Sequence, residues 1–136
     1  MCFQGVHIIF KRPKNILIML TETQHQQLLE EAKRWIDHLA TYVQTINDFK
    51  NKFYKWAAGK TDHDVLVQIE HFHNQFHIQL INLHDLKHSI RIHMRAVTLS
   101  PDTDHTPQHQ QLEDQYNFLI HDLDDLKADF TEFISD

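Results

Sequence analysis

The sequence predicts an all-α protein, an elongated, antiparallel, coiled-coil-like three-helix bundle preceded by a short N-terminal extension. Its 136 residues include only two glycines and three prolines, so the chain has few points at which a helix must end. Apolar residues also recur at intervals of three, four and seven along three long segments, which is the spacing at which a helix buries one side. We therefore expect one bundle domain over residues 21–135.

The extension, residues 1–20, differs from the rest of the chain. Two runs rich in β-branched and other apolar residues, 6–10 and 16–20, flank Arg12-Pro13-Lys14-Asn15 and have the composition of a β-hairpin. A two-stranded hairpin is marginal in water unless it packs against something else. A disordered leader, with Met19 as the functional start, is the alternative, and the sequence leaves both open.

The first long helix is expected over residues 23–58. Thr23 and Gln26 have the spacing of an N-terminal capping box, and Gly59 is placed to adopt the left-handed conformation that ends a helix. The core positions between them are Leu28, Ala32, Trp35, Leu39, Tyr42, Ile46, Phe49, Phe53 and Trp56.

The second helix is expected over residues 62–98, with Asp62 and Asp64 in its first turn, where carboxylates interact favourably with the helix dipole. Its core positions repeat at a strict interval of seven. They are Ile69, Phe76, Leu83, Ile90 and Val97.

The third helix is expected over residues 107–134. The segment Ser100-Pro101-Asp102-Thr103-Asp104 separates it from the second helix, and Pro107 suits its first position. Its core positions are Leu112, Tyr116, Leu119, Leu123, Leu126, Phe130 and Phe133.

The net charge of −6 is unevenly distributed. Residues 1–60 hold nine Lys/Arg and five Asp/Glu, whereas residues 61–136 hold four and fourteen. In an up-down-up bundle the first and third helices are parallel, so the lysines of residues 50–60 are expected beside the acidic end of the third helix. A nucleic-acid-binding protein gathers positive charge on one face. This chain has a single dense cationic group, which argues against a nucleic-acid partner.

Cys2 is the only cysteine, which excludes an internal disulfide and a thiolate zinc cluster and favours a reducing, cytoplasmic compartment. The longest apolar run, 16–20, is far shorter than a membrane span, and no signal-peptide cleavage pattern follows it. We therefore expect neither membrane insertion nor export.

Thirteen histidines are the compositional outlier, and many lie on one side of the second helix. The pairs His73–His77 and His84–His88 have i,i+4 spacing and can each chelate a transition metal such as zinc or nickel, with His38 as a possible further ligand. The plainer interpretation is solvated imidazoles and no cofactor. The histidine face comprises Glu70, His73, His77, His84, His88, Arg91 and Arg95, which share one arc at about 100° per residue.

Two further patterns on the second helix resemble sequence patterns of known functional sites. Glu70-x-x-His73 has the spacing used in di-iron bundles, but the other two helices have no glutamate at a core position. The segment Leu83-His84-Asp85-Leu86-Lys87-His88-Ser89-Ile90 resembles the phosphoacceptor box of histidine kinases, which implies that His84 would accept a phosphoryl group. Ser89 replaces the usual proline, and the chain has no glycine-rich ATP-binding part.

No Ser/His/Asp or Cys/His arrangement and no phosphate-binding glycine loop is present, so we predict a protein that is not an enzyme. Ile78, Ile92 and Phe118 lie off the core positions and are candidates for an interface. His93 occupies a core position and is expected to be a hydrogen-bonded core histidine, whereas His121 is expected at the surface. The favoured function is association, with a second copy or with another helical protein. The alternatives are a histidine-rich metal-binding or pH-responsive bundle and, third, a phosphoacceptor-like module.

Overall fold

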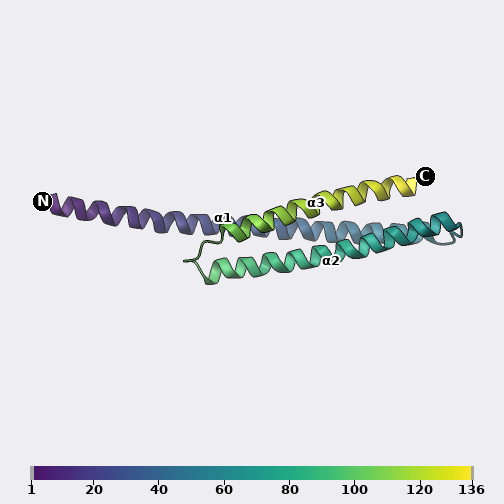
Figure 1. The fold of residues 1–136 in the computed structure, drawn as a ribbon, viewed down its shortest axis with the longest axis horizontal. Helices are drawn as coiled ribbons and strands as arrows, with labels where there is room; N and C mark the ends of the chain where they lie inside the picture. The colour runs from purple at the N-terminus through teal and green to yellow at the C-terminus, as the bar shows by residue number, and fades with distance from the viewer. Residues whose placement is uncertain (1, 136) are drawn as a thin grey trace.

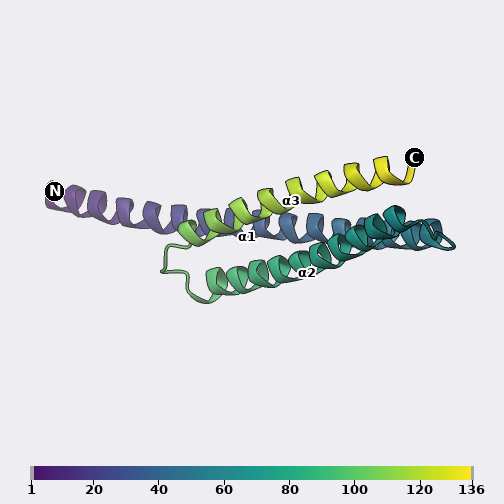
Figure 2. The ribbon, with the colours of Figure 1, turned by 45° about the vertical axis from the view of Figure 1, so that its right-hand side comes forward.

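The computed structural model consists of three long helices and describes the backbone of residues 2–135 and the side chains of residues 22–135. Helix α1 spans Cys2–Ala57, α2 spans His63–Leu99 and α3 spans Thr106–Ser135. Each helix is antiparallel to the next, so α1 and α3 run in the same direction (Figure 1, Figure 2). The predicted all-α, elongated three-helix bundle is confirmed.

The β-hairpin predicted for the N-terminal extension is wrong. Helix α1 begins at Cys2 rather than near residue 23, and the proposed capping box at Thr23 lies inside it. Extending an existing helix fixes one residue for each new hydrogen bond, whereas an isolated hairpin is marginal. The disordered leader and the domain boundary at residue 20 stay predictions, because the side chains of residues 1–21 lie outside the described part of the chain.

The connection between α1 and α2 is set by its own residues. Gly59 has a φ of 81°, in the left-handed region expected of the residue that follows a helix. Asp62 then caps α2, accepting hydrogen bonds from the backbone nitrogens of Asp64 at 3.0 Å and Val65 at 3.2 Å. These two features force the tight reversal that makes α1 and α2 antiparallel.

The connection between α2 and α3 ends in a similar cap. Asp104 accepts a hydrogen bond at 3.0 Å from the backbone nitrogen of Thr106, where α3 begins. This bond stabilises the carboxylate and lowers the pKa of Asp104. The start of α3 is also joined to α1, because Gln24 Nε2 donates to Thr106 Oγ1 at 3.1 Å.

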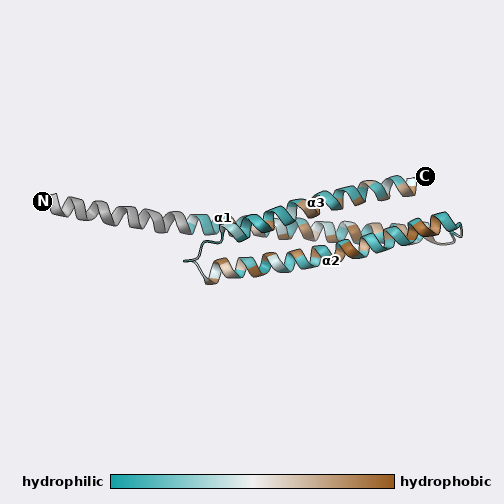
Figure 3. Ribbon diagram, in the orientation of Figure 1, coloured by the Kyte–Doolittle hydropathy of each residue, from teal (hydrophilic) through white to brown (hydrophobic). Residues whose placement is uncertain are grey.

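The core lies between the three predicted rows of apolar residues. Most of these positions are buried, and those that the described helices bury completely include Ala32, Leu39, Ile46, Phe76, Leu83, Ile90 and Leu123. Along α2 and α3, apolar and polar segments alternate instead of forming one continuous apolar run (Figure 3). None of the helices, over the part described, has an apolar stretch that could cross a bilayer.

The end of the bundle where α1 leads into α2 is packed with phenylalanine. Ring centroids lie 5.0 Å apart for Phe76 and Phe130, 5.8 Å for Phe53 and Phe76, and 4.9 Å for Phe72 and Phe133. These pairs join all three helices, and burying each ring stabilises the fold by roughly 1.5–3 kcal/mol. We call this the phenylalanine end.

The expected charge contact between the ends of α1 and α3 does not form as ion pairs. Among residues 22–135, no lysine or arginine nitrogen lies within 4.0 Å of a carboxylate oxygen. Lys60 lies over the ring of Trp56 at 4.8 Å, and Lys127 lies over Tyr42 at 5.5 Å. Exposed ion pairs stabilise a protein little, so these side chains remain solvated or cover aromatic surface.

A partly buried hydrogen bond joins α1 to α3 near the middle of the bundle. Tyr42 Oη donates to Asp124 Oδ1 at 2.6 Å. Burial, together with the hydrogen bond to Asp124 and the negative charge of that residue, raises the pKa of Tyr42 to about 12. The folded chain therefore favours the neutral phenol, whose pKa when unfolded is about 10.

Replacing Tyr42 with phenylalanine should therefore make stability less sensitive to alkaline pH. Because the folded-state pKa is raised, the contribution of the phenol is complete below pH 10 and is lost as the pH rises towards 12. From pH 8 to 11 the wild type should lose about 1 kcal/mol more unfolding free energy than Tyr42→Phe, measured by urea denaturation. The control is Tyr54→Phe, since Tyr54 is exposed. Equal losses in wild type and Tyr42→Phe would contradict the assignment.

Candidate functional site

The histidine face of α2 points to solvent, as the plainer interpretation predicted. His73, His77, His84 and His88 are all exposed. His73 Nδ1 forms a hydrogen bond with Tyr54 Oη at 2.9 Å, and His38, the suggested further ligand, contacts the Tyr116 hydroxyl of α3 instead. The described residues bring no third His, Cys, Asp or Glu close to either pair. Metal binding there stays a prediction.

The segment that resembles a phosphoacceptor box lies across the boundary between core and solvent. Leu83, Leu86 and Ile90 are buried, whereas His84 and Asp85 are exposed. An exposed imidazole is what a phosphoryl acceptor requires, but nothing else in the described residues bears on that hypothesis. His121 is exposed as expected and lies 3.3 Å from Asp125.

The three predicted interface residues lie on one side of the molecule. Phe118 borders a groove of about 320 Å³ between α2 and α3, which Asp85 and Asp122 also line. Ile78 and Ile92 lie one heptad before and after Asp85, so they share its side of α2. Phe118 is 70% exposed, Ile92 54% and Ile78 45%. We call these five residues the α2–α3 flank.

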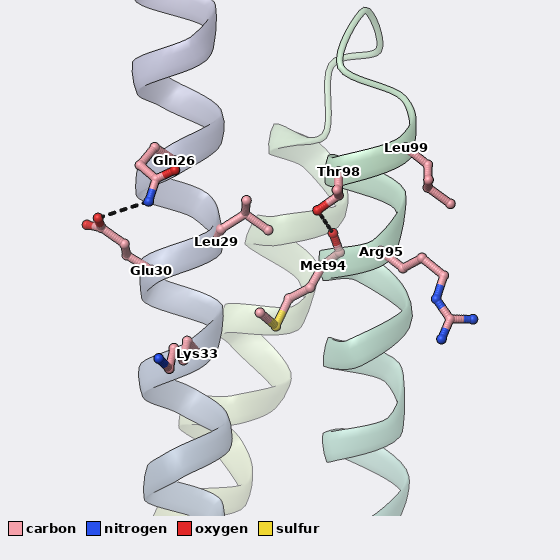
Figure 4. Close-up of a pocket in the computed structure, with 8 residues that line it drawn as sticks. All are labelled: Gln26, Leu29, Glu30, Lys33, Met94, Arg95, Thr98 and Leu99. Atoms are coloured by element: carbon pink, nitrogen blue, oxygen red, sulfur yellow. Dashed lines mark hydrogen bonds between the residues drawn. The ribbon is translucent and has the colours of Figure 1, made fainter.

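A second groove, of about 670 Å³, separates α1 from α2 (Figure 4). Leu29 and Met94 point towards each other across it, while Arg95 points away into solvent. Glu30 and Lys33 line the α1 side, so the groove has a narrow apolar floor and a rim of mixed charge. Leu99, which is 72% exposed, also lines this groove, so the groove offers apolar surface to a partner as well.

The end of the bundle near the α2–α3 connection contains buried histidines, and we call it the histidine end. His93, His105 and His109 are all buried. His93 Nε2 lies 2.9 Å from His109 Nδ1, and His109 Nε2 lies 3.1 Å from Glu31 Oε1. Trp35 stacks on His109 with ring centroids 4.6 Å apart and planes inclined by 25°. Side chains from all three helices therefore form one hydrogen-bonded chain, Glu31–His109–His93.

The hydrogen bonds between Glu31, His109 and His93 determine which ring nitrogens carry a proton. With both rings neutral, His109 donates from Nε2 to the Glu31 carboxylate and accepts at Nδ1 from Nε2 of His93. His93 Nδ1 is then a buried lone pair with no hydrogen-bond partner. Burial, together with the smaller effects of the neighbouring His109 and His105, lowers the pKa of His93 to about 4.

His105 joins the histidine end to the α2–α3 connection. Its Nε2 donates to the backbone oxygen of Ser100 at 2.8 Å, which joins the two ends of the connection. Its ring centroid lies 6.3 Å from that of His93 and 5.8 Å from that of His25 on α1. The connection is thus packed against residues of α1 and α2.

Two groups of side chains, among those described, have three possible metal ligands close together. In the first, the ligand atoms of Glu31, His109 and Glu113 lie within 4.8 Å of one another, and His109 is buried. The second, His121 with Asp122 and Asp125, comes from α3 alone and is largely exposed. The first group is the better-defined site because it combines two helices and is partly shielded from water.

The sequence predicted part of this site and missed the rest. His93 was expected to be a hydrogen-bonded core histidine, and this is confirmed. The roles of Glu31, His109 and Glu113 were missed, because Glu31 is 78 residues from His109 along the chain. The available signals were the i,i+4 spacing of His109 and Glu113 and the position of Glu31 beside the core residue Ala32.

The buried His93 should make metal-free protein less stable in acid. Its folded pKa of about 4 is below the unfolded value of 6.5, so between these pH values only the unfolded chain gains the proton. His109, His105 and Glu31 are the titratable groups around it, and they remain in a His93→Leu variant. From pH 7.5 to 4.5 in EDTA, the variant should lose about 2 kcal/mol less unfolding free energy than the wild type, measured by urea denaturation. The same substitution at exposed His88 is the matched control, and a His93→Leu loss equal to the wild-type loss would contradict the prediction.

The comparisons with known proteins add no functional evidence. A scan of protein-family models, a search of curated proteins and a search of solved structures each returned no match to this chain. The function must therefore be argued from the two features described above, the α2–α3 flank and the histidine end.

Proposed function

We propose that this protein is a non-enzymatic helical module that acts by self-association through the α2–α3 flank. The observation that carries the proposal is the exposure of Phe118 beside the groove between α2 and α3, with Ile78 and Ile92 on the same side. Exposed apolar side chains that gather on one side of a soluble domain are typical of interaction surfaces. The cytoplasm, suggested by the single cysteine, is the proposed location.

The core explains why these apolar residues are available to a partner. The core positions of α2 already fill the space between the three helices, and Ile78 and Ile92 lie outside that row. A bound surface that covers Phe118 would remove most of its ring from water, which stabilises a complex by roughly 1.5–3 kcal/mol for a side chain of this size. Aromatic residues, phenylalanine among them, are also enriched in protein–protein interfaces.

The charge distribution favours a second copy as the partner. Asp85 and Asp122 line the groove, and α3 holds seven acidic residues against the single cation Lys127. The cations of α1 include Lys33, Arg34, Lys52 and Lys55, which are all exposed. A two-fold arrangement in which α1 of each copy faces the α2–α3 flank of the other would form this complementary contact twice.

Replacing Phe118 with glutamate should weaken self-association by at least tenfold, because it removes the apolar anchor and adds negative charge to an acidic groove. Sedimentation equilibrium over low to high micromolar concentrations measures the mass. The wild type should form dimers in this range, whereas Phe118→Glu should remain closer to the monomer mass.

The matched control is Leu66→Glu, which puts the same charge at a residue that is 43% exposed and lies away from the flank. Circular dichroism checks that both variants keep their helices. A wild type that is monomeric at several hundred micromolar, or a Leu66→Glu variant that dissociates as much as Phe118→Glu, would refute self-association through this surface.

A further inference from the structure

We infer that Glu31, His109 and Glu113 form a binding site for one divalent transition-metal ion, such as Zn²⁺, at the histidine end of the bundle. The site would bind the ion through one imidazole nitrogen and two carboxylates, contributed by α1 and α3. It is separate from the histidine face of α2 and does not depend on self-association.

The ligand spacing fits a small ion. His109 Nε2 and Glu31 Oε1 are 3.1 Å apart, and one ligand atom from each of Glu31, His109 and Glu113 lies within 4.8 Å of the other two. Zn²⁺ binds imidazole nitrogen and carboxylate oxygen at about 2.0–2.2 Å, so two ligands of one ion lie roughly 3–3.5 Å apart. Glu31 and Glu113 are only partly buried, and they can rotate towards His109, whose ring is held in place by Trp35.

The buried neighbour of His109 supports the same interpretation. A metal-bound histidine usually donates its other ring N–H to a fixed acceptor, which orients the ring and makes it a better ligand. His93 Nε2 occupies that place, 2.9 Å from His109 Nδ1. With an ion on Nε2, His109 would carry its proton on Nδ1 and donate it to His93, whose own proton would then be on Nδ1. His93 Nδ1, which has no hydrogen-bond partner in the structure, would then be an N–H group instead of a lone pair.

The donor set also selects the class of ion. Imidazole favours zinc and other first-row transition metals, whereas Mg²⁺ and Ca²⁺ prefer sites made only of oxygen. Three protein ligands leave a further position for water, which can reach the site past the partly exposed glutamates. Because the ligands come from α1 and α3, the ion would cross-link two helices that are far apart in the chain and would stabilise the folded state by mass action.

Trp35 provides a direct optical probe of this site, because its ring stacks on His109. The chain has two tryptophans, so a Trp56→Phe background leaves Trp35 as the only one. Untagged full-length protein in this background should be titrated with Co²⁺, a paramagnetic analogue of Zn²⁺. We expect saturable quenching of Trp35 with one ion per chain, reversed when Zn²⁺ displaces Co²⁺, and a higher melting temperature with Zn²⁺.

The variants separate this site from the other histidines. Glu113→Gln removes a ligand at a partly exposed position and should weaken Co²⁺ binding at least tenfold, and Glu31→Gln should do the same. His109→Gln should abolish binding, although it alters a buried residue, so the two glutamate variants carry the test. In the matched control, His77→Gln with His84→Gln breaks both pairs of the histidine face and should leave the affinity for Co²⁺ unchanged.

Three results would overturn the inference. The first is no quenching of Trp35 at millimolar Co²⁺ in folded protein. The second is an affinity that Glu113→Gln and Glu31→Gln leave unchanged, and the third is an affinity that falls with the histidine-face variant instead. Repeating the titration with Phe118→Glu keeps the test independent of self-association, since this variant should bind Co²⁺ as tightly as the wild type.

Discussion

The whole architecture depends on the burial of three rows of heptad-spaced residues against one another. At the phenylalanine end, Phe53, Phe76 and Phe130 bring a ring from each helix into one cluster, with centroids 5.0–5.9 Å apart. A helix of this length is not held by backbone propensity alone, so these tertiary contacts stabilise each helix as well as the bundle. The caps at Asp62 and Asp104 then fix where α2 and α3 can begin.

The same constraint determines which residues remain available to partners. A heptad row covers only one side of a helix, and apolar side chains elsewhere on α2 or α3 find no room in the core. Ile78, Ile92 and Phe118 are therefore exposed because of the core packing and not because of a loop or a local distortion. Their position beside Asp85 and Asp122 gives the α2–α3 flank an acidic border, and this border would favour a partner surface with exposed lysines and arginines.

The sequence could predict features that arise within one helix, and it could not predict features that depend on contacts between helices. The core positions repeat within single helices, so residues such as Ile46, Leu83 and Leu123 could be identified from local spacing alone. The hairpin was wrong for the same reason, since β-branched composition in residues 6–20 says nothing about the helix that continues into them. The hydrogen-bonded chain Glu31–His109–His93 could not be predicted, because it depends on how the three helices are positioned relative to one another along the bundle axis. Exposure of the histidine face follows from local periodicity, whereas the Tyr116 contact of His38 depends on how α3 packs.

The buried polar residues at the histidine end restrict how far the helices can slide along one another, which an apolar core alone does not. If α3 slid by seven residues along α1, Leu112 would take the place of Leu119 and Leu123 that of Phe130, so these core positions would stay apolar. The same slide would separate Glu31 from His109 and Tyr42 from Asp124, which takes the partners of the buried His109 and Tyr42 side chains away at a cost of about 1–3 kcal/mol each. Polar contacts in the interior of a helical bundle can in this way select one register among several apolar ones. These polar contacts therefore contribute specificity, while the apolar rows along the bundle contribute stabilisation, so the two kinds of contact have different physical roles.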